Sequence, residues 1–180
     1  MALTFGRGFS SKVKRIIVIL LFFLIAIAAT LAGVLTPLSA QEIDDRNSQL
    51  SGLQQDIKNL TIVERTGAIL KNNLVICLLM FVPVGGPVFG LYALYNTGVF
   101  IAAQSLSYGA PPVLVLLLLF VFPFTWLEFA AYSTALSESF WFIRRILQGH
   151  VVRELKNTGI LILISMGLLA LGAVVEALMI

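Results

Sequence analysis

Glu128 is the residue of this chain best placed to carry chemistry. It lies in the apolar stretch 112–143, in which Glu138 is the only other acidic or basic residue. Because an ionisable side chain at bilayer depth costs several kcal/mol, it normally faces protein, water or a partner. We expect a neutral carboxyl group satisfied by a neighbouring helix. A proton or ion relay and a polar clamp between helices or subunits are the alternatives.

Three other polar residues interrupt apolar stretches and are candidates for the same intramembrane site: Asn73, Asn96 and Glu176. Asparagine can form hydrogen bonds between helices in lipid, worth about 1–2 kcal/mol in model peptides, so we expect both asparagines to be packing groups. Glu176 lies near the end of the sequence, where it can reach water. Glu138 is interpreted as a boundary charge that can pair with Arg145 at helical spacing.

The motifs of common enzymes are missing from the sequence. There is no phosphate-binding glycine loop, no zinc-type histidine pair and no G-x-S-x-G elbow. One cysteine, Cys77, and one histidine, His150, are too few for a structural zinc site within the chain. We therefore predict a non-enzymatic protein with no cofactor and no metal.

The composition is that of a protein whose solvent is lipid. Hydrophobic residues make up 59% of the chain and charged residues 12%, with a mean hydropathy of +0.99. Soluble domains have about 45–50% apolar and about 25% charged residues. The net charge of +3 does not indicate a nucleic-acid partner, because the basic residues gather at the ends of the apolar blocks.

The apolar blocks predict an all-α, polytopic transmembrane helix bundle of about five spans within one domain, 1–180. The expected segments are a first span at 16–35, an extracytoplasmic amphipathic segment at 41–71, a broken hairpin at 72–106, a kinked span at 112–143, a cytoplasmic basic loop at 144–157 and a last span at 158–180. Leu38-Ser39-Ala40-Gln41 resembles a signal-peptidase site. However, the preceding apolar core of about 20 residues exceeds the about 7–15 of a signal peptide, which favours a retained anchor.

Proline and glycine interrupt two of these segments. Pro83, Gly85, Gly86 and Pro87 cannot continue a regular helix, so residues 72–106 either cross the membrane twice or form a re-entrant pair. Pro123 is expected to kink the span at 112–143. A straight helix from Val113 to Arg145 would be about 50 Å long, whereas the hydrocarbon core is about 30 Å thick. This element must therefore tilt, kink at Pro123 or protrude into the cytoplasm.

The polar segment 41–71 has an apolar stripe at three- and four-residue steps, which predicts an amphipathic helix. The stripe consists of Ile43, Leu50, Leu53, Ile57 and Leu60. It either packs on the outer ends of the spans or docks another protein.

Two clusters of basic residues predict the orientation. Arg7, Lys12, Lys14 and Arg15 precede the first span, and Arg144, Arg145, Arg153 and Lys156 lie in the segment 144–157. Because positive charge is concentrated on the cytoplasmic side of membrane proteins, we expect both clusters to be cytoplasmic. The chain then has a cytoplasmic N-terminus and an extracytoplasmic C-terminus in the cell membrane, whether residues 72–106 cross twice or re-enter.

Several landmarks follow one another in a familiar order: Lys71-Asn72-Asn73, Gly85-Gly86 with Gly90, Asn96-Thr97-Gly98, Pro123 with Glu128 and Ala131, and Val175-Glu176. In this order the chain resembles the stage II sporulation protein M family of small polytopic membrane proteins. Phe124-Thr125 departs from the family's His-Gly, and Thr97 is inserted into its Asn-Gly pair. The resemblance implies a five-span protein without established catalysis, and one member is linked to a membrane complex.

These features together predict a non-enzymatic membrane scaffold or accessory subunit. Its partners would be membrane lipids and other membrane or cell-surface proteins, further copies of the chain included. Pairs of small residues that let helices approach closely would supply contact faces: Ala29 with Gly33, Ala131 with Ala135, and Gly98 with Ala102. The alternative is a small transporter or channel-like protein that uses Glu128, since carriers build such sites at broken helices.

Overall fold

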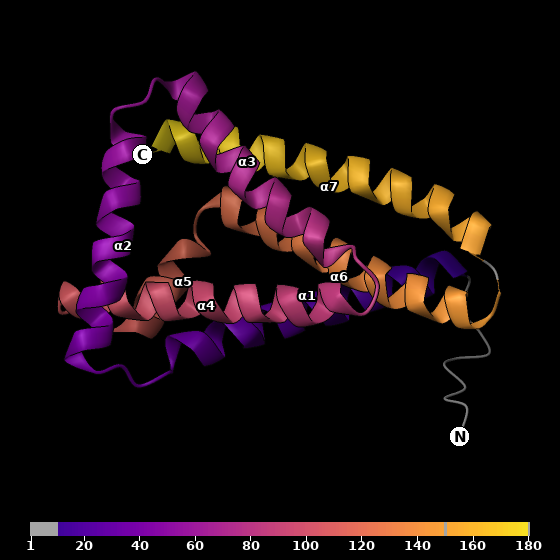
Figure 1. Cartoon of the computed structure of the whole chain (residues 1–180), viewed down its shortest axis with the longest axis horizontal. Helices are drawn as coiled ribbons and strands as arrows, with labels where there is room; N and C mark the ends of the chain where they lie inside the picture. The colour runs from indigo at the N-terminus through magenta and orange to yellow at the C-terminus, as the bar shows by residue number, and fades with distance from the viewer. Residues whose placement is uncertain (1–10, 150, 180) are drawn as a thin grey trace.

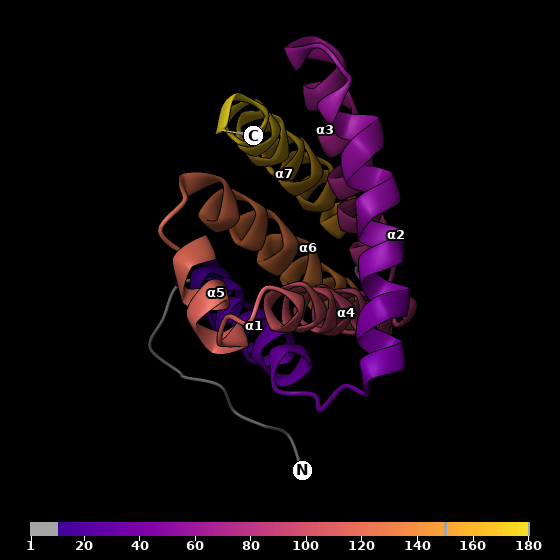
Figure 2. The ribbon, with the colours of Figure 1, turned by 90° about the vertical axis from the view of Figure 1, so that its left-hand side faces the viewer.

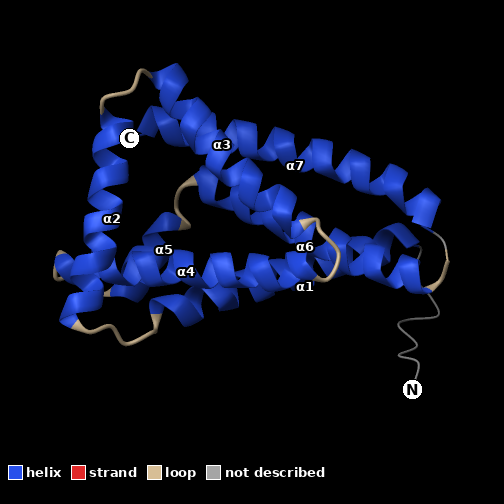
Figure 3. Cartoon of the chain, viewed as in Figure 1, coloured by secondary structure: helices blue, strands red, loops and turns tan. Residues whose placement is uncertain are grey.

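The fold consists of seven helices and, in the part of the chain that is described, no strand (Figures 1 and 3). The computed structural model describes residues 11–149 and 151–179, without the side chains of residues 11, 53–58 and 151–154. The helices are α1 (Ser11–Val34), α2 (Ala40–Lys58), α3 (Ile62–Met80), α4 (Gly85–Ser107), α5 (Pro112–Leu119), α6 (Pro123–Leu147) and α7 (Val151–Met179). The predicted all-α bundle is confirmed. Arg7 and His150 lie outside the described residues.

Three helices in the described residues are long and apolar enough to cross a membrane. They are α1 from Lys12, α4, and α7 from Leu155. The helices α5 and α6 pass the same test together, although they are bent by 87° at the break between them, so the number of candidate spans is three or four. The chain is thus a multi-pass membrane protein by the length and composition of its helices.

Helix α6 is the axis of the bundle. It packs against α1, α3, α4 and α7 (Figure 2), and every residue from Ala131 to Ser139 is buried. The run is rich in alanine, serine and threonine, and such small side chains let neighbouring helices approach closely from all sides. The polar side chains within this run therefore face protein rather than lipid.

Helices α1 and α4 touch backbone to backbone where Gly33 faces Gly98. A Cβ atom on Gly33 would lie 2.0 Å from the carbonyl oxygen of Tyr95, and one on Gly98 would lie 2.0 Å from that of Thr30. On α6, Ala131 and Ala135 are also completely buried. These small-residue faces, which the sequence offered as contacts for other proteins, are occupied by packing within the chain.

Helix α2 lies across one end of the bundle, roughly perpendicular to the long helices (Figure 1). It begins with a capping arrangement, because the backbone N–H of Ser39 donates to Glu42 Oε2 (2.8 Å) and the Ser39 hydroxyl donates to the same oxygen (2.7 Å). The Ser39 backbone and hydroxyl, with help from the charge of Arg46, hold the pKa of Glu42 below its ordinary value. The signal-peptidase-like sequence is thus the start of this helix.

One side of α2 packs on α4. The guanidinium of Arg46 lies 4.8 Å from the ring centre of Phe100, and Asn47 Nδ2 donates to the carbonyl oxygen of Ala103 (3.5 Å). Of the apolar stripe, Ile43, Leu50 and Leu60 are half-buried; the side chains of Leu53 and Ile57 lie outside the description. The segment 41–71 is not one helix, because α2 ends at Lys58 and a capping box of Thr61 and Glu64 starts α3.

The first expected break, at Pro83–Pro87, is a tight turn between α3 and α4. Val84 has a φ of +68°, and the N–H of Gly85 donates to the carbonyl oxygen of Pro83 (2.8 Å). Such a γ-turn is rare and strained. A Cβ atom on Gly86 would lie 2.3 Å from the carbonyl oxygen of Met80, so glycine is required where α4 folds back onto α3.

The second expected break is sharper than a kink. The chain leaves the helical conformation at residues 120–122, and Pro123 starts a new helix at its first position, where the missing N–H is harmless. The Thr125 hydroxyl and the Trp126 indole N–H donate to the carbonyl oxygens of Leu119 and Phe120, at 2.8 and 2.7 Å. These side chains replace the lost backbone bonds.

The expected loop at 144–157 is largely helical, since α6 ends at Leu147 and α7 begins at residue 151.

Candidate functional site

Glu128 and Asn73, both singled out from the sequence, meet between α3 and α6. Asn73 Nδ2 donates a hydrogen bond to Glu128 Oε1. Both side chains are half-buried. The contact satisfies one carboxyl oxygen from a neighbouring helix, and an interhelical bond of this kind normally pins the two helices in register.

Glu176 of α7 joins the same region. A Cβ atom on Gly172 would lie 3.8 Å from Cγ of Glu128, and Glu176 follows Gly172 by one helical turn on the same face. The charge of Glu176 is close enough to act on Glu128. Tyr132, one turn after Glu128, is 7% exposed and within electrostatic range of both carboxyl groups. We call Asn73, Glu128, Tyr132 and Glu176 the carboxyl cluster.

The carboxyl cluster has the chemistry of a site for a proton or a small cation, because it combines two carboxyl groups, an amide and a phenol in apolar surroundings. Asn96 is not part of it: this residue lies half-buried on α4, and no hydrogen bond among the described residues joins it to the cluster. No group of three or more histidine, cysteine, aspartate or glutamate side chains in the described part of the chain could hold a metal ion.

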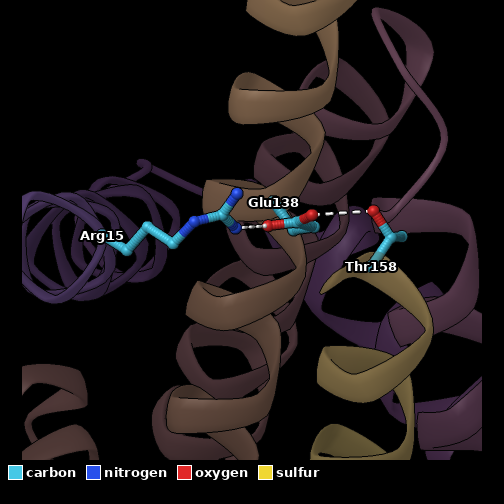
Figure 4. Close-up of polar contacts among 3 residues, drawn as sticks. All are labelled: Arg15, Glu138 and Thr158. Atoms are coloured by element: carbon cyan, nitrogen blue, oxygen red, sulfur yellow. Dashed lines mark hydrogen bonds and ion pairs between the residues drawn. The ribbon is translucent and has the colours of Figure 1, made fainter. Parts of the chain in front are cut away.

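A second polar site, centred on Glu138, was missed by the reasoning from sequence (Figure 4). Arg15 Nη1 lies 2.6 Å from Glu138 Oε2, and the hydroxyl of Thr158 donates to Oε1 (2.7 Å). Glu138 is 1% exposed, so it is enclosed by the bundle and is not the solvated charge that the sequence suggested. It does not pair with Arg145, whose Nη1 donates instead to Gln148 (3.2 Å).

The next residue extends the Glu138 site to the turn between α3 and α4. The hydroxyl of Ser139 donates to the carbonyl oxygen of Val82 (2.9 Å). Ser133, Ser137 and Ser139 are all buried beside Glu138. Small side chains concentrated in one short run let other helices pack closely around it. This run was the sequence signal from which the burial of Glu138 could have been predicted.

The fold and these sites define a class: an all-helical, multi-pass membrane protein with two polar sites between its helices. Comparison with protein-family models, with curated proteins and with solved structures gives no match. The resemblance to the stage II sporulation protein M family therefore stays a prediction from the sequence.

Proposed function

We propose that this chain is a non-enzymatic membrane subunit that binds another membrane or cell-surface protein through α2. The observation that carries the proposal is the position of α2, which lies across the end of the bundle. Apart from Ala40, the exposed side chains in the described part of α2 are polar: Gln41, Glu42, Asp44, Asp45, Ser48, Gln49 and Ser51. The basic Arg46 is turned onto Phe100, so the face that remains for a partner is acidic.

The proposal includes five crossings, with the N-terminus cytoplasmic and α2 extracytoplasmic. The hydrogen bond from Ser139 to Val82 supports a crossing by α3, because it puts the α3–α4 turn at the level of Glu138 and Arg15. Helix α3 then ends near the same boundary at which α1 and α7 begin. The basic residues at that end support its being cytoplasmic.

The test is co-purification from native membranes in mild detergent, followed by mass spectrometry. A stoichiometric partner is expected with the parent chain and should be lost when Asp44→Lys and Asp45→Lys reverse the acidic face. The control, Gln148→Lys, adds positive charge at the opposite end and should retain the partner. A chain that is recovered alone, or a partner that ignores the α2 substitutions, would overturn this function.

A small transporter or channel-like protein is the second candidate, and the hydrogen bond between Asn73 and Glu128 favours it. The α6 backbone rises about 15 Å between Glu128 and Glu138, which is half of a hydrocarbon core about 30 Å thick. With Glu138 at the cytoplasmic boundary, Glu128 would lie near the midplane, close to the α5–α6 break. Carriers often place their sites at such broken helices.

Flux measurements in proteoliposomes test the transporter or channel-like function. Proton or monovalent-cation flux should be present with the parent chain, abolished by Glu128→Gln and unchanged by the water-exposed control Glu42→Gln. The absence of flux in the parent chain, or flux that survives Glu128→Gln, would eliminate the candidate.

A further inference from the structure

The ion pair between Arg15 and Glu138 brings two basic segments to one place, the start of α1 and the end of α6. The guanidinium carbon of Arg15 lies 5.5 Å from the ring centre of Trp141, and that of Arg144 lies 5.3 Å from the same centre. Cations close to an indole ring are held there by its electrostatic field. Two arginines distant in the sequence thus share one aromatic platform.

The first turns of α1 and the last turn of α6, which hold these two arginines, carry further basic residues. We call the whole set the basic end, and it comprises Lys12, Lys14, Arg15, Trp141, Arg144 and Arg145. Glu138, the buried carboxylate beside it, pairs with Arg15. Lys12, Lys14 and Arg144 form no ion pair with a described carboxylate. The basic end therefore keeps positive charge that an anion can neutralise.

The platform also contains an unused hydrogen-bond donor. The indole Nε1 of Trp141 is buried and has no acceptor, although the side chain is only 9% exposed. Buried N–H groups nearly always find a partner. A ligand with several acceptor oxygens could satisfy the indole and the neighbouring guanidinium, and arginine binds phosphate oxygens in a bidentate manner.

The surface beside the basic end is apolar, which indicates that the phosphate would belong to a lipid. Ile16 and Leu20 of α1 are 57% and 59% exposed and one helical turn apart, and Phe140 of α6 is 45% exposed. The ring of Phe140 packs on Phe22 of α1, 6.2 Å between centres. Apolar surface thus begins directly next to the basic residues, and the acyl chains of a phospholipid could pack on it.

From this arrangement we propose that the basic end binds the phosphate of an anionic phospholipid, whose acyl chains lie along α1 and Phe140. Anionic lipids are attracted to clusters of lysine and arginine at the cytoplasmic ends of membrane helices. The site described here differs from diffuse attraction, because it includes a specific donor, the indole N–H of Trp141. The inference does not depend on the partner or transport role proposed above, and it rests on the proposed function only for the cytoplasmic position of this end.

The test uses the full chain in lipid nanodiscs made of phosphatidylcholine with a small fraction of phosphatidylglycerol, and native mass spectrometry of the lipids that stay bound after release. The parent chain should retain phosphatidylglycerol selectively. Arg144→Gln and Lys12→Gln should each reduce its retention about fivefold, the effect of about one interfacial base. Arg46→Gln, which removes a base at the opposite end, is the matched control and should change nothing.

Two further measurements separate this site from simpler explanations. Trp141→Phe keeps an aromatic ring and every charge but removes the N–H, and it should also weaken retention; equal retention would overturn the specific site. Inorganic phosphate added to the nanodiscs should not displace the lipid, because it lacks acyl chains. Displacement by phosphate at equal concentration, or retention unaffected by both base substitutions, would overturn the assignment of a lipid.

Discussion

Arg15 of α1 and Glu138 of α6 form an ion pair, with Nη1 2.6 Å from Oε2, although 123 positions separate them in the sequence. The second carboxyl oxygen accepts from Thr158 of α7. One buried carboxylate thereby joins three helices. Helix α1 supplies the positive charge that makes burial of Glu138 possible, so α1 is an integral part of the bundle.

Removing the arginine should destabilise the protein strongly. In Arg15→Met, Glu138 stays buried without its countercharge, and the free energy of unfolding should fall by about 3–5 kcal/mol. The double variant Arg15→Met, Glu138→Leu should recover much of this loss, since it leaves no buried charge. Equilibrium unfolding in mixed micelles measures both. Lys12→Met, one turn earlier on α1, is the control; an equal loss there would contradict the role of the ion pair.

The contact between Gly33 and Gly98 should not tolerate even a methyl group. Gly33→Ala and Gly98→Ala would put Cβ 2.0 Å from a carbonyl oxygen of the facing helix, so α1 and α4 must move apart. We expect a loss of about 1–3 kcal/mol in the free energy of unfolding for each. Gly167→Ala in α7, where nothing lies within 4 Å of the added carbon, should be neutral or stabilising by about 0.5–1 kcal/mol.

Asn73 and Glu128 should be energetically coupled. A double-mutant cycle with Asn73→Ala and Glu128→Ala, each of which removes one partner of the hydrogen bond, is expected to give an interaction energy of about 0.6–1.7 kcal/mol, between the average and the largest value found for such pairs of membrane helices. The same cycle with Asn96→Ala in place of Asn73→Ala should give no coupling, because Asn96 lies outside the carboxyl cluster. Additive effects of Asn73→Ala and Glu128→Ala would contradict the contact.

The start of α2 should loosen in acid. The pKa of Glu42 is lower in the folded chain than in the unfolded one, because Ser39 donates hydrogen bonds to the ionised carboxylate. The stabilisation is therefore present above the unfolded pKa and is lost as the pH falls through the folded pKa. Titration of the Glu42 carboxyl by nuclear magnetic resonance, with amide exchange at the first turn of α2, measures this.

Ser39→Ala provides the control for that titration. It removes the hydroxyl donor and should move the titration of Glu42 back toward the ordinary range of a glutamate. A Glu42 that titrates identically in the parent chain and in Ser39→Ala would show that the cap does not form in solution.

The local sequence was sufficient to predict where most of the helices lie. Apolar runs of membrane-spanning length predicted α1, α4 and α7, and the interruption at Pro83–Pro87 predicted the turn before α4. Pro123 was harder, because a proline can either kink a helix or start a new one. The outcome depended on whether the freed carbonyl groups found other donors, and Thr125 and Trp126 supplied them.

What the sequence shows and what only the packing decides differ most clearly for the two glutamates of α6. The isolation of Glu128 in an apolar stretch is visible in the order of the residues, because the penalty for burying a carboxyl group depends on its own surroundings. The role of Glu138 is not visible there. Its burial requires four helices packed around α6, and its countercharge comes from the far end of the chain. Pairing over such a separation follows from how the helices pack, which local hydrophobicity and helix propensity do not specify.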